Sequence, residues 1–99
     1  METKIKTKIK TAKQLERHFK GISNYHRIDI LLLVSQSRGV TVDNIAQALN
    51  CNFKTISEHT RRLVQAGLLN KNYQGRTGVH TLSPYGETIT KFITTFQHS

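Results

Sequence analysis

The chain has 99 residues and a formal net charge of +9, from 15 lysines and arginines against 6 acidic residues. This length predicts one domain with a modest core, and the positive surplus favours a polyanionic partner, nucleic acid first. A single cysteine excludes an internal disulfide and no apolar run approaches the roughly 20 residues that cross a bilayer, so we expect a cytoplasmic protein without a signal peptide or membrane partner.

Residues 1–10 form a basic segment with lysine at positions 4, 6, 8 and 10. The alternation fits a strand, while Ile5 and Ile9 also fit the apolar face of a helix that continues downstream. A solvated tail is the third reading, and the sequence leaves all three open. We expect a basic N-terminal arm at 1–10 ahead of one domain at 11–99.

Two helices are predicted next. Thr11 and Gln14 have capping-box spacing, which predicts a helix over 12–20 that ends at Gly21. The segment 24–37 is apolar on nearly every side, so we expect a buried central helix there.

A short break separates the two helices that follow. Thr41 is expected to cap a helix over 42–49, and Asn52 to cap one over 53–66. Gly39 is expected to supply the positive φ that often ends a helix. Only "NCN" lies between the two helices, and this short turn is that of a helix-turn-helix.

The last third of the chain changes from helical to strand-like period. The segments 68–73 and 79–82 are predicted strands, joined by the hairpin loop "QGRTG", and "SP" then starts a helix over 84–97. A hairpin directly after a helix-turn-helix is a wing. The expected fold class is therefore mainly α (α+β), a winged helix-turn-helix with a two-stranded wing and flanking N- and C-terminal helices.

The helix predicted over 53–66 has two unlike faces. Ile56, Leu63 and Val64 share an apolar face, while the opposite face is polar. A major groove admits one α-helix, whose polar residues near the N-terminus meet the base edges. We therefore expect contacts with bases of double-stranded DNA from Lys54, Thr55, Ser57, Glu58 and Arg61, although a solvated helix face remains the alternative.

The wing over 68–82 carries Arg76 between two glycines. An arginine at a hairpin tip can enter a narrow minor groove, and it can equally be a solvated loop residue. Lysines of the arm would add attraction to phosphate that is independent of sequence. The expected backbone and wing contacts are Thr41, Arg62, Lys71, Tyr73, Gln74, Arg76 and Thr77.

The run "VTVDNIAQALNCNFKTISEHTRRLVQAGLL" resembles the ArsR family of winged-helix transcription regulators, and "GRTGVHTLSPYG" resembles that family's wing and the start of its last helix. The resemblance covers about 25–97. It implies a homodimeric DNA-binding transcription regulator. We expect a repressor, although the sequence leaves repression and activation open. Two departures are Thr60, where the family usually has leucine and the helix would lack one apolar contact, and His80, where an aromatic residue is frequent.

In that family the first and last helices usually form the dimer contact, here 12–20 and 84–97. The last helix offers a stripe of apolar residues at helical spacing. The alternative is that this stripe packs only on its own domain. The expected interface residues are Leu15, Phe19, Ile89, Phe92, Ile93 and Phe96.

Metal-sensing members of the family carry cysteines at positions that match Thr41 and Asp43 here, or Asp and His on the last helix. This chain has neither set, since its last helix carries Glu87 with His98 at its end. We therefore expect no metal and no cofactor. The sequence also lacks a nucleophile–base pair or a phosphate-binding glycine loop, so we expect no enzyme.

Two residues near the turn, Cys51 and His59, can be explained by packing alone. Cys51 stands close to a helix N-terminus, where a thiolate is favoured, and could be a redox switch or a small apolar filler. His59 matches a frequent family histidine and is expected to be packed and hydrogen-bonded rather than catalytic.

A different function also stays open, that of a protein-interaction module within a larger complex. Winged helices used in this way often lose the basic recognition face. This chain keeps Lys54, Arg61, Arg62 and Arg76, which favours DNA.

Overall fold

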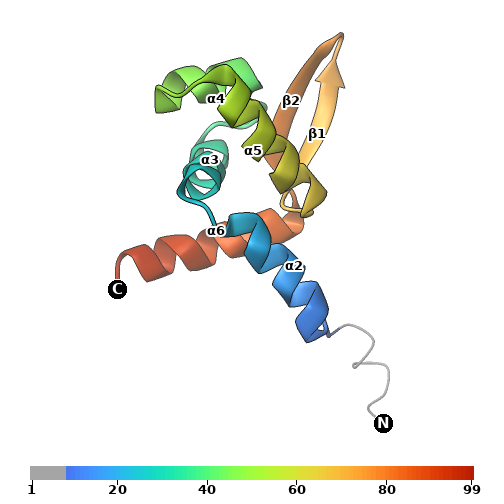
Figure 1. Cartoon of the computed structure of the whole chain (residues 1–99), viewed down its shortest axis with the longest axis vertical. Coiled ribbons are helices and arrows are strands. Elements are labelled where there is room, and N and C mark those ends of the chain that lie inside the picture. Colours follow the sequence, from blue (N-terminus) through green and yellow to red (C-terminus); the bar gives the residue numbers. More distant parts are fainter. Residues whose placement is uncertain (1–8) are drawn as a thin grey trace.

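The structure, a computed structural model, describes residues 9–99. The expectation for the arm at 1–10 therefore falls almost entirely outside the described residues. In chain order the elements are α2 (Ala12–Ile22), α3 (Tyr25–Gln36), α4 (Val42–Leu49), α5 (Phe53–Gln65), β1 (Leu69–Gln74), β2 (Thr77–Leu82) and α6 (Pro84–Gln97), as Figure 1 shows. The expected winged helix-turn-helix is confirmed, with helix ends within two residues of those predicted.

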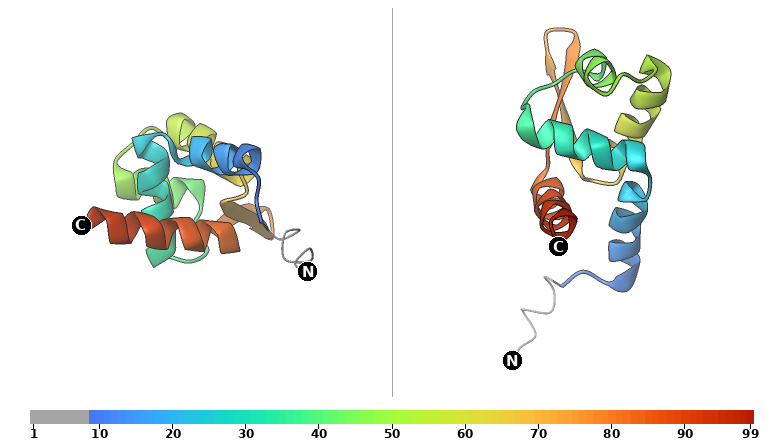
Figure 2. Two further views of the ribbon diagram at one scale, coloured as in Figure 1. Left: turned by 90° about the horizontal axis from the view of Figure 1, so that it is seen from below. Right: turned by 90° about the vertical axis from the view of Figure 1, so that its left-hand side faces the viewer.

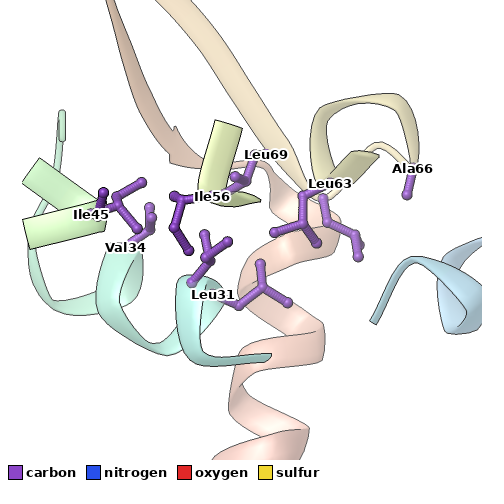
Figure 3. Packing of buried hydrophobic residues seen from close by; sticks show 10 residues of the cluster. Leu31, Val34, Ile45, Ile56, Leu63, Ala66 and Leu69 are labelled. Atoms are coloured by element: carbon purple, nitrogen blue, oxygen red, sulfur yellow. The ribbon is translucent and has the colours of Figure 1, made fainter. Parts of the chain in front are cut away.

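Helix α3 is the centre of the domain, and it contacts α2, α4, α5, α6 and β2. Figures 1 and 2 show α4 and the tip of the wing at one end of the molecule, and α6 with α2 at the other end. Ile30, Leu31 and Val34 of α3 are almost completely buried, as are Ile56 and Leu63 of α5. Figure 3 shows Leu31 and Val34 of α3 close to Ile56 and Leu63 of α5. Burial of each side chain contributes about 1.5–3 kcal/mol.

The predicted caps set the helix starts. Thr41 accepts a hydrogen bond from the N–H of Asn44 and completes a capping box. Asn52 accepts from the N–H groups of Lys54 and Thr55 at 2.8 and 3.2 Å. These interactions satisfy backbone donors that the first turn of a helix leaves free.

Gly21 does not end α2 as predicted, because the helix continues through Ile22. The glycine has a packing role instead. A Cβ at Gly21 would lie 2.6 Å from the Cβ of Ala66, so the absence of a side chain allows α2 to approach the end of α5. Gly39, by contrast, has the expected positive φ, +71°.

The hairpin loop is shorter than the predicted five residues. Gln74 pairs with Thr77, so only Gly75 and Arg76 form the turn. Gly75 has φ of +66°, and a glycine at the first central position suits a two-residue hairpin turn whose twist matches the strands.

One backbone connection was not foreseen from the sequence. Val40, between α3 and α4, forms an isolated antiparallel bridge with His80 of β2. The N–H of His80 donates to the carbonyl of Val40 at 2.8 Å. The bridge joins the start of the helix-turn-helix to the wing.

Thr60 stands inside the core although it is polar. It is 1% exposed, and its Oγ1 has no hydrogen-bond partner among the described residues. The side chain therefore contributes its methyl group to the core while burying a hydroxyl that has no partner among these residues.

Thr60→Val should raise the free energy of unfolding by about 1 kcal/mol, because it keeps the shape and removes a buried group without a partner. Thr60→Ser keeps the hydroxyl, loses the methyl group and should lower stability. Urea denaturation of the three proteins measures both changes. A valine variant less stable than the wild type would show that the hydroxyl is satisfied in solution.

Candidate nucleic-acid interface

Helix α5 presents the five residues predicted to contact bases. Lys54, Thr55 and Arg61 are exposed, while Ser57 and Glu58 are half-buried. Ile56, Thr60 and Leu63 form the opposite, buried face. The two faces of the helix therefore separate as the sequence pattern predicted, and the polar face is free to meet a ligand.

Glu58 connects two of the predicted DNA contacts in the free protein. Its carboxylate accepts from Nη2 of Arg61 at 2.7 Å and from Nε of Arg62 at 3.0 Å. The hydrogen bond from Arg61 is the main reason why the pKa of Glu58 is lowered, and Arg62 acts in the same direction. The side chains of Arg61 and Glu58 are 54% and 45% exposed, and exposed pairs of this kind contribute little stability. Arg61 can therefore exchange Glu58 for another acceptor at low cost.

The wing carries a row of exposed polar and basic side chains at the end of the molecule where α4 lies (Figure 1). The Nζ of Lys71 lies 5.3 Å from the centroid of the Tyr73 ring, so the two residues share one side of β1. Arg76 occupies the turn itself. The exposed wing residues predicted as contacts are Lys71, Tyr73, Gln74, Arg76 and Thr77.

Thr41 and Arg62, the other predicted backbone contacts, are already engaged in the free protein. The Oγ1 of Thr41 accepts from Asn44, which leaves its O–H proton available to donate. Arg62 is exposed and pairs with Glu58.

A group of aromatic and basic side chains joins the start of α3 to α5. The Nη1 of Arg27 lies 3.3 Å from Nδ1 of His59, and the rings of His26 and His59 stack at 5.2 Å. His59 thus has the packed, hydrogen-bonded position expected for it. Burial is the main reason why its pKa is lowered, and the charge of Arg27 acts in the same direction.

Cys51 is half-buried at the helix-turn-helix turn and packs against the core. Its thiol donates to the carbonyl of Leu49 at 3.3 Å and lies 3.9 Å from Nδ1 of His26. This packing fits the role of an apolar filler, and the redox alternative stays a prediction.

His18 is a structural residue that the sequence pattern did not single out. It is 4% exposed, and its Nδ1 donates to the carbonyl of Ala66 at 2.9 Å, which ties α2 to the end of α5. Its ring also lies 5.1 Å from that of Tyr85. This role could have been predicted from the spacing of His18 from Leu15 and Ile22, which puts all three on one helical face.

The six residues predicted for a dimer interface divide into two sets. Ile89 and Ile93 are partly buried against the core of their own domain. Leu15, Phe19, Phe92 and Phe96 are exposed, with Phe96 at 70%. The rings of Phe92 and Phe96 lie 5.7 Å apart.

Two further findings concern the described residues, 9–99. No group of three or more His, Cys, Asp or Glu side chains among them is placed to hold a metal ion. None of their helices has the length and apolar character that crossing a membrane requires.

This arrangement, a helix-turn-helix with a polar recognition helix followed by a basic wing, is the winged-helix DNA-binding fold of transcription regulators. The family model described as "Bacterial regulatory protein, arsR family" matches residues 25–71. The resemblance seen in the sequence is thereby confirmed: residues 25–71 are ArsR-like, and the fold is a winged helix-turn-helix. No curated protein is similar enough in sequence to match the chain.

Solved structures share the fold at low sequence identity. The homodimeric winged helix-turn-helix DNA-binding domain Mb0332 of Mycobacterium bovis, a possible ArsR-family regulator, has 21% identity and a TM-score of 0.79, covering 99% of this chain and 87% of that one. HlyU of Vibrio cholerae has 19% identity and a TM-score of 0.79, covering 100% of both chains. The transcriptional repressor PagR of Bacillus anthracis has 22% identity and a TM-score of 0.74, covering 82% and 93%.

Stability should fall on acidification because of buried His80. Burial lowers its pKa from the ordinary 6.5, Lys71 acts in the same direction, and the hydrogen bond to the Val40 carbonyl opposes both. As pH falls through 6.5, His80 becomes protonated in the unfolded chain before it does so in the folded chain. Protonation therefore favours the unfolded state, and the free energy of unfolding decreases.

Urea denaturation between about pH 7.5 and about pH 5.5 measures this slope. His80→Phe, which cannot titrate, should flatten it, and His59→Asn should do so to a smaller extent because His59 is less buried. An unchanged slope in His80→Phe would assign the acid sensitivity to another group.

Proposed function

We propose that the protein is a homodimeric, sequence-specific double-stranded DNA-binding transcription regulator that acts as a repressor. Helix α5 enters the major groove, and the wing lies on the minor groove or backbone. The observation that carries this proposal is the outward polar face of α5, with an exposed basic wing beside it, on a chain of net charge +9. The similarity to PagR, which is a transcriptional repressor, supports repression rather than activation.

Base reading is assigned to the part of α5 from Lys54 to Arg61. Lys54, Thr55 and Ser57 lie in its first turns, where a recognition helix meets base edges. Arg61 can donate two hydrogen bonds to a guanine, and Glu58 can accept from a cytosine amino group. Glu58 and Arg61 pair with each other in the free protein. On binding DNA they would separate, and each would contact one of two adjacent bases.

Backbone contact is assigned to the wing and to the sides of the recognition helix. Arg76 at the turn is the candidate for the minor groove, since a narrow groove concentrates negative potential. Arg62, beside the polar face of α5, and Thr41, at the start of α4, are the candidates for phosphate contact. Lys71, Tyr73, Gln74 and Thr77 complete the contact along the wing.

Dimerisation is assigned to the exposed apolar residues of α2 and α6. Leu15, Phe19, Phe92 and Phe96 remain 40–70% exposed in the single chain, although phenylalanine and leucine gain most from burial. These helices lie at the end of the molecule away from the wing tip (Figure 1), so two chains could join there and still present both recognition helices. The homodimeric state of the Mb0332 domain supports this assignment.

Arg61→Ala should weaken binding to the preferred duplex by roughly 1–3 kcal/mol and binding to random duplex by less, so the ratio of the two affinities falls. Fluorescence anisotropy with both duplexes measures it. Lys91→Ala on α6 removes the same charge at the other end of the molecule and is the matched control. Equal losses on both duplexes would make Arg61 a phosphate contact and would contradict its place in the groove.

Phe92→Glu with Phe96→Glu should convert the dimer to monomers, because burying two carboxylates at an apolar interface is strongly unfavourable. Sedimentation velocity measures the change. Thr94→Glu with Thr95→Glu adds the same charge to the side of α6 that faces α3 and should leave the dimer intact. A dimeric Phe92/Phe96 variant would place the interface elsewhere.

A further inference from the structure

A basic hollow lies where α2, α3 and α5 meet, and of its residues only Arg62 belongs to the contacts assigned above. Arg17 and Lys20 of α2, Arg27 of α3 and Arg62 of α5 line it, together with Gln65. Its volume is about 280 Å³, and none of the described residues that line it is acidic. Four cations without an acid in the lining favour an anionic occupant.

Arg27 gives the strongest evidence that the basic hollow binds an anion. Its side chain is half-buried, Nη1 is directed to His59, and its buried Nε has no hydrogen-bond partner in residues 9–99. Within the same residues neither Arg17 nor Arg27 lies within ion-pair distance of a carboxylate, whereas Lys20 pairs with Glu16 and Arg62 with Glu58. A partly buried guanidinium with an N–H group that lacks an acceptor is stabilised by an anion placed beside it.

The basic hollow continues the polar face of α5. At about 100° per residue, Lys54, Glu58, Arg61 and Gln65 fall within about 60° of one another around the helix. Gln65 thus lies in line with the residues assigned to bases while it also lines the hollow. The 13 residues of α5 span about 20 Å, but a major groove is only about 12 Å wide. A helix that lies in the groove from its start to Arg61 therefore brings its last turn to the edge, where a phosphate strand runs.

We propose that the basic hollow binds a phosphate group of the DNA backbone at the edge of the groove that α5 enters. This inference rests on the proposed function and adds α2 to the DNA-binding surface. Around α2, Arg17 and Lys20 lie about 100° or more from Leu15 and Phe19. One side of α2 can therefore meet DNA while the other meets a second copy of the chain.

The phosphate contact is tested by replacing backbone phosphates of the preferred duplex, one at a time, with uncharged methylphosphonates. The wild-type protein should lose affinity at one position per half-site that flanks the groove holding α5. Arg17→Gln with Lys20→Gln, two exposed residues whose loss should not affect folding, should lose nothing further at that position. Arg27→Gln, checked by circular dichroism, should give the same pattern.

Salt dependence provides the second readout. The Arg17/Lys20 variant should weaken binding to preferred and random duplex alike, with a slope of log K against log salt flatter by about 0.9 for each phosphate that it no longer neutralises. Arg38→Gln with Lys91→Gln, which removes two charges from the groove between α3 and α6, is the matched control and should keep the wild-type sensitivity to each methylphosphonate.

The outcomes separate this inference from the proposed function. A wild-type protein that binds no duplex at low salt would overturn both. A wild-type protein that discriminates sequences, with Arg17/Lys20 and Arg27 variants that match the control at every methylphosphonate, would overturn the phosphate contact alone. Inorganic phosphate titrated into the DNA-free protein tests the other source of this anion. The inference would be overturned if phosphate bound tightly and this binding required Arg27, while Arg27→Gln left the affinity for DNA unchanged. That result would assign the hollow to a free anion.

Discussion

The burial of one face of α5 against α3 is the constraint on which the surface of this protein depends. Ile56 and Leu63 are completely buried, and Thr60 lies between them although its hydroxyl is unsatisfied. Because a helix has only one such face here, the residues opposite it must face outward, and those residues are Lys54, Glu58 and Arg61. Packing in the core thus decides which side chains of α5 are exposed to a ligand.

Polar contacts over long sequence distances then attach the flanking elements to this unit. His18 of α2 donates to the carbonyl of Ala66, and Ser83, which caps α6, donates to the carbonyl of Gly67 at 2.6 Å. The bridge between Val40 and His80 joins the wing to the start of α4. Two of these three contacts converge on the residues that follow α5, so α2 and α6 are both fixed relative to the end of the recognition helix.

Much of the fold could be predicted from sequence because its determinants are local. Caps such as Thr41 and Asn52 and the spacing of apolar residues depend on neighbours within a turn or two, and they gave the helices and the wing. Gly21 was misread because its role depends on Ala66, which is far along the chain. The predicted hairpin loop was too long. The strands pair as far as Gln74 and Thr77 because the backbone at Gly75 forms a two-residue turn.

For the candidate site, the sequence predicted which face of α5 is polar, but not how the side chains of that face interact. Helical spacing gave the polar face of α5, whereas the sharing of Glu58 by Arg61 and Arg62 depends on side-chain conformations that spacing does not determine. The stripe on α6 was read as one surface, but contacts with the core divide Ile89 and Ile93 from the exposed phenylalanines. The basic hollow needed three helices to be placed together, which no local pattern contains.

The central claim is that this fold reads DNA sequence as a symmetric pair of recognition helices. Selection of binding sites from random duplex DNA by the full chain measures this most directly. The enriched sites should contain a two-fold symmetric motif whose half-sites are about one helical turn, or a multiple of it, apart. Recovery of DNA without any enriched motif, despite binding at low salt, would show attraction by charge alone and would contradict the claim.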